Sequence, residues 1–172
     1  MDQWKQLVRA VPDFPSAGVT FRDITPLLRD PRSLHDVVEA LATGFEPGQV
    51  DAVAAIESRG FMFGAPLAVR LGAGFIPIRK LGKLPGATIS RQYALEYGAG
   101  HLEMHRDALQ RGDRILLVDD VLATGGTAAA AVAMVEELGG RILETAFVIE
   151  LLALEGRARL PDHLSVRALL SY

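Results

Sequence analysis

Short aliphatic runs alternate with helical segments along most of this 172-residue chain, and this alternation restricts the fold more than any other feature. Four runs are bounded by turn or charged residues and predict buried strands. They read DAVAAIE (51–57), GFIPIRK (74–80), RILLVDD (114–120) and RILETAFVIE (141–150). Around them, apolar residues recur at helical spacing, as in the helix that Asp30 and Pro31 open. The pattern predicts an α/β fold, with a mainly parallel twisted sheet and helices on both faces.

Two regions interrupt this alternation. Near the N-terminus, apolar residues at helical spacing predict a small helix that ends at Pro12. These residues are Trp4, Leu7, Val8 and Val11. Residues 13–30 are expected to be irregular, and residues 81–113, with many glycines and mixed polarity, are expected to form a loop and hairpin outside the main sheet. No linker divides the chain, so residues 1–172 are expected to form one domain.

Composition excludes several classes of protein. Hydrophobic residues make up 49% of the chain and charged residues 23%, which suits a compact globular core. The absence of cysteine excludes disulfides, thiolate metal sites and a cysteine nucleophile. A net charge of −3 offers no basic footprint for nucleic acid, and no apolar run is long enough for a membrane span. The N-terminal residues lack the basic start and the apolar core of a signal peptide. We therefore expect a cytoplasmic protein that binds neither nucleic acid nor membranes.

The segment RILLVDDVLATGGT (114–127) places two adjacent aspartates and a glycine-rich turn after an aliphatic run. The strand Ile115–Val118 would deliver Asp119 and Asp120 to the edge of the sheet where ligands bind. Paired glycines in the turn 123–127 would let backbone N–H groups converge at the N-terminus of the next helix. Such a turn cradles a phosphate group, and its threonine hydroxyls add donors.

The two aspartates would repel each other if they lay alone. As acceptors for two sugar hydroxyls, beside a bound divalent cation, they complete a site for a ribose 5-phosphate. The alternative is a surface turn that only caps a helix, with both carboxylates solvated. The competing phosphate-binding patterns G-x-x-x-x-G-K-[ST] and strand-turn-helix G-x-G-x-x-G do not occur in the sequence.

The stretch LLVDDVLATGGT resembles the phosphoribosyl pyrophosphate motif of the type I phosphoribosyltransferases. Four further stretches narrow the resemblance to the adenine phosphoribosyltransferases within that family. They are FPSAGVTFRDITPLL (14–28), ESRGFMFG (57–64), RKLGKLPGATIS (79–90) and YALEYGAGHLEMHRDAL (93–109). Ser16-Ala17 and Ala99-Gly100-His101 are mild departures from the family pattern.

The resemblance implies the type I phosphoribosyltransferase fold, a homodimer, and transfer of a 5-phosphoribosyl group from phosphoribosyl pyrophosphate to N9 of adenine. The products would be AMP and pyrophosphate, with Mg²⁺ as cofactor. Two alternatives stay open: a transferase of this fold for another base, such as xanthine, hypoxanthine or guanine, and a non-catalytic regulator that senses phosphoribosyl pyrophosphate. Such a regulator typically carries a DNA-binding domain, and no helix-turn-helix pattern precedes the first long helix.

The resemblance also assigns residues to the phosphoribosyl donor. The donor is expected at Asp119, Asp120, Ala123, Thr124, Gly125, Gly126 and Thr127, with its pyrophosphate at Ser58, Arg59, Lys80 and Lys83. Mg²⁺ is expected to be held mainly by the substrate, with Asp119 and Asp120 nearby and no direct protein ligand. A cis Glu57–Ser58 peptide is implied as well. For the lysines, the alternative is a solvated charged surface.

Adenine is expected to contact Val19, Thr20, Phe21, Arg22 and Leu151, within a base-binding hood formed by residues 1–30. Without the resemblance, Phe21 and Leu151 read as ordinary core residues. Residues 81–105 are expected to form a flexible catalytic loop that excludes water, and the implied catalytic residues are Glu96, Tyr97 and Arg59. Glu96 would either help remove the N9 proton or stabilise the cationic ribose.

The segment HLEMH (101–105) places two histidines at a spacing that metal ligands adopt on a helix. The glutamate does not adjoin the first histidine, as the zinc-protease pattern requires. We interpret the segment as a strand whose face with His101, Glu103 and His105 forms a polar lid surface. A zinc site is not expected there.

Overall fold

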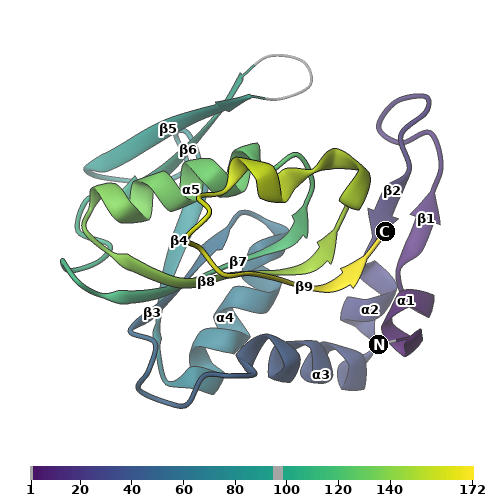
Figure 1. Ribbon diagram of the computed structural model, residues 1–172, viewed down its shortest axis with the longest axis horizontal. Helices are drawn as coiled ribbons and strands as arrows, with labels where there is room; N and C mark the ends of the chain where they lie inside the picture. The colour runs from purple at the N-terminus through teal and green to yellow at the C-terminus, as the bar shows by residue number, and fades with distance from the viewer. Residues whose placement is uncertain (1, 95–98) are drawn as a thin grey trace.

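The computed structural model describes residues 2–94 and 99–172, and its centre is a seven-stranded sheet with the order β5-β6-β4-β3-β7-β8-β9 (Figure 1). The last five strands in this order are parallel to one another. They are β3 (Ala52–Ile56), β4 (Gly74–Lys80), β7 (Arg114–Leu122), β8 (Arg141–Glu150) and β9 (Val166–Ser171). The predicted mainly parallel α/β sheet is confirmed.

Helices cover both faces of this sheet. Helices α3 (Pro31–Ala42) and α4 (Arg59–Leu71) lie on one face, and α5 (Gly126–Glu137) lies on the other (Figure 1). Strand β7 serves both faces, because Leu116 and Val118 belong to the core beneath α3 and α4, whereas Ile115 and Leu117 belong to the core beneath α5. Burial on both sides explains why the strands read as unbroken aliphatic runs.

Helix α4 lies so close to the sheet that glycine is required at its contact with β3. A Cβ atom on Gly64 would lie 2.5 Å from the Cβ of Ala55. We expect Gly64→Val to lower the free energy of unfolding in urea by about 3 kcal/mol, because the added branches overpack this contact. Val69→Ala, at an 83% exposed position of the same helix, is the control and should change it by less than about 0.5 kcal/mol. Equal values for the two variants would contradict the close packing.

The N-terminal region differs from the prediction. Helix α1 spans only Asp2–Gln6, and Arg9–Val11 form strand β1, which pairs antiparallel with β2 (Phe21–Asp23). A short helix, α2 (Thr25–Arg29), follows. The helix predicted through Val11 and the irregular segment predicted over 13–30 are therefore wrong in part. The pairing of Val11 with Phe21 joins residues across a turn, and helical spacing within one segment carries no sign of such a partner.

The region 81–113 also departs from the prediction, because its hairpin belongs to the sheet. Strands β5 (Thr88–Ala94) and β6 (Ala99–His105) pair antiparallel, and β6 continues the sheet by pairing with β4. The buried side chains Ile89, Leu102 and Met104 join the core beneath α5, which holds the hairpin in place. The hairpin therefore forms the edge of the sheet rather than a separate loop.

Two short 3-10 helices, η1 (Leu152–Leu154) and η2 (Gly156–Arg159), connect β8 to β9. They follow the strand end at which Glu150 and Leu151 lie. Over residues 2–94 and 99–172, no helix combines the length and the apolar character needed to cross a membrane.

Candidate active site

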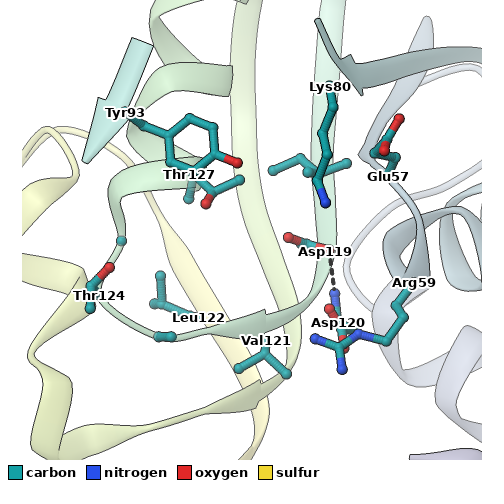
Figure 2. Close-up of a pocket in the computed structure, with 14 residues that line it drawn as sticks. Glu57, Arg59, Lys80, Tyr93, Asp119, Asp120, Val121, Leu122, Thr124 and Thr127 are labelled. Atoms are coloured by element: carbon teal, nitrogen blue, oxygen red, sulfur yellow. Dashed lines mark hydrogen bonds and ion pairs between the residues drawn. The ribbon is translucent and has the colours of Figure 1, made fainter. Parts of the chain in front are cut away.

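Strand β7 carries Asp119 and Asp120 within the strand itself, which continues to Leu122 instead of stopping at the predicted Val118. Successive side chains of a strand point to opposite faces, so the two carboxylates diverge. Asp119 lies next to the amino end of Lys80, while Asp120 lies beside Arg59 (Figure 2). The Arg59 Nε atom is 2.7 Å from Oδ2 of the buried Asp120, and the Asp120 N–H donates to Oδ1 of Asp119 at 2.9 Å.

A cavity of about 280 Å³ opens at this end of the sheet. Its lining includes most of the residues that the resemblance assigns to the donor. The lining residues are Ile56, Glu57, Arg59, Lys80, Tyr93, Asp119, Asp120, Val121, Leu122, Ala123, Thr124, Gly125, Thr127 and Ala128. The cavity combines three carboxylates, two cationic side chains and the backbone of a glycine-rich turn, which suits a sugar phosphate.

The turn after β7 places two glycines at the N-terminus of α5. Gly125 has a φ of +79°, a left-handed conformation that favours glycine, and α5 begins at the buried Gly126. Thr124 and Thr127 line the cavity on either side of these glycines. The first N–H groups of α5 have no partner within the helix, so the turn presents donors and the positive end of the helix dipole to the cavity.

We expect Gly125→Ala to reduce kcat/KM for the phosphoribosyl donor by about 10²-fold, because the N–H donors of the turn would be displaced from the bound phosphate. The alanine would be strained at this φ, and its Cβ would overlap the Gly156 carbonyl oxygen, so the turn would have to move. Gly44→Ala is the matched control, since Gly44 has a φ of +91° but no atom within 4 Å of an added Cβ. Donor kinetics equal to wild type in Gly125→Ala would exclude the turn as the phosphate site.

Burial disfavours the charged forms of the Asp119 and Asp120 carboxylates. Desolvation, followed by the neighbouring Asp120 carboxylate, raises the pKa of Asp119 well above its ordinary range. Burial also raises the pKa of Asp120, although Arg59 acts in the opposite direction. Because both pKa values are raised, keeping both carboxylates charged is unfavourable in the free protein. A bound cation or a ligand rich in hydrogen-bond donors would offset this free-energy cost. Among the residues that the structure describes, no three His, Cys, Asp or Glu side chains gather as metal ligands.

The remaining residues predicted for pyrophosphate lie around one side of the cavity. Lys80 lines it and points toward Asp119 in Figure 2. Ser58 is exposed before the first residue of α4 and follows a cis peptide bond from Glu57, as the resemblance implies. Lys83 is exposed in the loop after β4 and is not a lining residue of the cavity.

Arg79 joins the two segments that flank this side of the cavity. Its Nε donates to Oε2 of Glu57 at 3.0 Å, and its Nη1 donates to the Lys83 carbonyl oxygen at 3.1 Å. These contacts tie the turn after β3 to the loop after β4. Arg79 therefore shapes the cavity wall, while Arg59 and Lys80 supply its cationic lining.

The predicted polar lid surface on β6 is wrong for Glu103, which is only 3% exposed. One of its oxygens accepts hydrogen bonds from the N–H groups of Lys83 and Leu84, both at 2.7 Å. Burial alone would raise the pKa of Glu103, but the N–H donors of this loop hold that pKa below its ordinary value. His105 reaches the Pro85 carbonyl oxygen through Nε2 at 2.8 Å. Glu103 and His105 thus anchor the loop 83–85, while His101 on the same strand is exposed.

None of the residues predicted for adenine lines the 280 Å³ cavity. Phe21 contacts a lining residue, because the Arg59 guanidinium lies 5.1 Å from the centroid of the Phe21 ring. Arg22 instead lies over the Tyr172 ring at 4.1 Å, and the Leu151 N–H donates to the Leu122 carbonyl oxygen at 2.9 Å. The Val19 N–H and carbonyl already pair with Ser16 and Phe14 within the preceding turn.

Sequence reasoning missed Tyr93 as a lining residue and did not assign Glu57 a contact of its own. Tyr93 lies beside Thr127 in Figure 2, with its hydroxyl directed toward the cavity. Its register partner in the hairpin is Gly100, and a Cβ there would overlap the tyrosine ring. That cross-strand glycine is the one signal that could have indicated an inward-folded tyrosine. The predicted catalytic residues Glu96 and Tyr97 lie outside the described residues.

Comparison with known proteins decides the family. The sequence model of the phosphoribosyl transferase domain family matches residues 23–165 of this chain. An adenine phosphoribosyltransferase of Carboxydothermus hydrogenoformans is 57% identical over 156 residues, which cover 91% of this chain and 92% of the relative. The chain belongs to the adenine phosphoribosyltransferase family. A relative in this family from Nitrosospira multiformis is 51% identical over 160 residues, covering 93% and 91% of the two chains.

Solved structures of the family agree with the fold. The chain is similar to adenine phosphoribosyltransferase from Rhodothermus marinus, with a TM-score of 0.94, 50% identity and coverage of 99% of this chain and 97% of that one. It is also similar to the Saccharomyces cerevisiae enzyme complexed with an imino-altritol bisphosphate and adenine, with a TM-score of 0.92, 40% identity and coverage of 98% and 97%. The type I phosphoribosyltransferase fold predicted from the sequence is confirmed.

Proposed function

We infer that this protein transfers the 5-phosphoribosyl group of phosphoribosyl pyrophosphate to adenine and forms AMP and pyrophosphate. The observation that carries the donor assignment is the cavity whose lining combines Asp119 and Asp120 with the glycine turn at the N-terminus of α5. Family membership supports adenine as the acceptor, because the relatives carry that specificity in their names. A phosphoribosyl sensor without catalysis would need the same cavity, but its relatives would not be named as transferases.

We assign the 5-phosphate to the turn 123–127 and the ribose hydroxyls to the aspartates. The turn offers N–H donors and two threonine hydroxyls, and the carboxylates accept from the two hydroxyls of the sugar. As the bond to pyrophosphate breaks, positive charge grows on the ribose ring and negative charge on the leaving group. Asp119 stabilises the first, and Arg59, Ser58, Lys80 and Lys83 are proposed to stabilise the second.

The carboxylate pair suits Mg²⁺ as well. Its oxygens are the ligands that this ion prefers, and the raised pKa of Asp119 marks a place where a further positive charge is favourable. We propose that the donor brings Mg²⁺ with it and that the substrate provides most of the ligands. When bound, the ion neutralises charge on the leaving pyrophosphate.

The base would lie between the cavity and the N-terminal segment. We propose that residues 1–30 form a hood in which Val19, Thr20, Phe21 and Arg22 meet one side of adenine and Leu151 the other. The contact of Arg59 with the Phe21 ring supports this placement, since it links the two subsites. Residues 81–105 are proposed as the catalytic loop that carries Glu96 and Tyr97.

The oligomeric state and the location are also proposals. We propose that the protein acts in the cytoplasm as a homodimer, as the resemblance to its family implies. Sedimentation velocity at working concentration tests the dimer, and a single species with the mass of one 18.5 kDa chain would exclude it.

The activity is tested by incubating the protein with phosphoribosyl pyrophosphate, Mg²⁺ and one base at a time, with chromatographic detection of nucleotides. The bases are adenine, hypoxanthine, guanine, xanthine, uracil and orotate. We expect AMP from adenine, with a kcat/KM far above that of any other base. A higher kcat/KM for another base would correct the acceptor, and binding of the donor without a nucleotide product from any base would favour the sensor.

A further inference from the structure

The phosphate turn does not stand alone, because its backbone touches that of η2. A Cβ on Gly125 would overlap the Gly156 carbonyl oxygen. A Cβ on Gly156 would overlap the Ala123 carbonyl oxygen and lie 3.1 Å from the Gly125 nitrogen. Both glycines are buried. The two segments are therefore in direct backbone contact, and a movement of Gly156 would displace the turn that receives the phosphate.

A bidentate salt bridge between Arg157 and Glu150 holds Gly156 in this position. The next residue, Arg157, donates from Nε to Oε1 of Glu150 at 2.6 Å and from Nη2 to Oε2 at 2.7 Å. Its Nη1 donates to the Val166 carbonyl oxygen at 2.6 Å, at the start of β9. Glu150 is only 5% exposed at the end of β8. Two parallel charge-assisted bonds fix both the distance and the orientation of η2 relative to the sheet.

The same segment is tied to the strand that leads into the turn. The Leu151 N–H, next to Glu150, donates to the carbonyl oxygen of Leu122, the last residue of β7. The segment 150–157 therefore contacts Leu122, which precedes the turn, and Gly125, which lies within it. The backbone N–H groups of the turn can converge on a phosphate only while this second segment keeps its position.

We propose that Glu150 and Arg157 are positioning residues for the phosphoribosyl donor, which act by holding Gly156 against the phosphate turn. The proposal rests on the proposed function of the turn as the phosphate site. Neither residue lines the cavity, so they act on the donor only through the backbone of the turn. They add to the site a support that the turn sequence itself does not contain.

The test is the dissociation constant of phosphoribosyl pyrophosphate with Mg²⁺, measured by titration calorimetry. Arg157→Met keeps much of the side-chain volume and removes both bonds to Glu150. We expect its Kd to rise about ten-fold, which corresponds to about 1.4 kcal/mol, with a smaller change in kcat at saturating donor. The double variant Glu150→Gln, Arg157→Met should bind no more weakly than Arg157→Met, because the two residues act as one unit.

Arg114→Met is the matched control. Arg114 makes the same kind of bridge to Asp51, with Nε and Nη2 bonds of 2.9 and 2.8 Å and a further bond to the Gly48 carbonyl oxygen, at the opposite end of β7. The Arg114→Met variant should have a lower Tm than wild type and an unchanged Kd for the donor. If Arg157→Met also lowers the Tm and binds the donor as tightly as wild type, the bridge is only structural and the proposal is overturned.

Arg157→Lys covers the case in which Arg157→Met does not fold. A lysine keeps the positive charge but cannot form the two parallel bonds, so we expect a Kd between those of wild type and Arg157→Met, and above wild type by at least about three-fold. A wild-type Kd in Arg157→Lys overturns the proposal. Failure of the wild-type protein itself to bind the donor would instead refute the proposed function, which keeps the two failures distinct.

Discussion

The double variant Asp119→Asn, Asp120→Asn is expected to lose at least about 10³-fold in kcat/KM for the phosphoribosyl donor. Removing one group aligned with charge that develops in a transition state typically costs about 10²- to 10³-fold, and here two such groups are changed. The amides keep the shape of the site but lose the negative charge that faces the sugar hydroxyls and the cationic ring. Initial rates of AMP formation over a range of donor concentrations measure the effect.

The stability of the single variant Asp119→Asn separates chemistry from folding. Desolvation and the Asp120 charge raise the pKa of Asp119, so its charged form is disfavoured in the folded protein and its contribution to stability falls as pH rises through that pKa. At pH 8 the neutral asparagine is therefore expected to give a Tm at least equal to that of wild type. Wild-type kinetics in the double variant Asp119→Asn, Asp120→Asn would mean that neither carboxylate contributes to donor binding or to catalysis.

Glu96→Gln is expected to lower kcat and kcat/KM together, by about 10²- to 10⁴-fold if the carboxylate serves as a general base for the N9 proton. Both constants fall because the group acts in the transition state and adds little to substrate binding. The dissociation constant of the donor should stay near that of wild type. The measurement is the steady-state rate at saturating adenine and donor, with Glu46→Gln, at an exposed position between α3 and β3, as the control.

A wild-type kcat in Glu96→Gln would indicate a solvated carboxylate. Catalysis would then rest on Arg59, the two aspartates and Mg²⁺.

The strand-turn-helix arrangement over residues 114–137 could be predicted from the sequence because all of its determinants are contiguous. The aliphatic residues of β7, the two aspartates and the glycines at the start of α5 lie within one stretch of the chain, and the geometry follows from strand and helix rules. The parallel strands were predictable for the same reason. Their burial on both faces appears directly as aliphatic runs.

The parts that sequence reasoning missed depend on contacts between distant segments. Glu103 looks like a surface residue within HLEMH, but the N–H groups of Lys83 and Leu84 draw it inward. Tyr93 enters the cavity only because the hairpin folds back beside α5. Gly156 supports the phosphate turn from a segment whose own pattern indicates nothing about phosphate. Local periodicity carries no record of these partners.

The most direct test of the proposed site is a crystal structure of the protein with AMP bound. We expect the 5-phosphate to accept hydrogen bonds from the backbone N–H groups of the turn 123–127, and the two ribose hydroxyls to donate to the carboxylates of Asp119 and Asp120. Adenine should lie beside Phe21. An AMP molecule whose phosphate lies away from this turn, or whose ribose hydroxyls do not reach the aspartates, would contradict the assignment of the cavity.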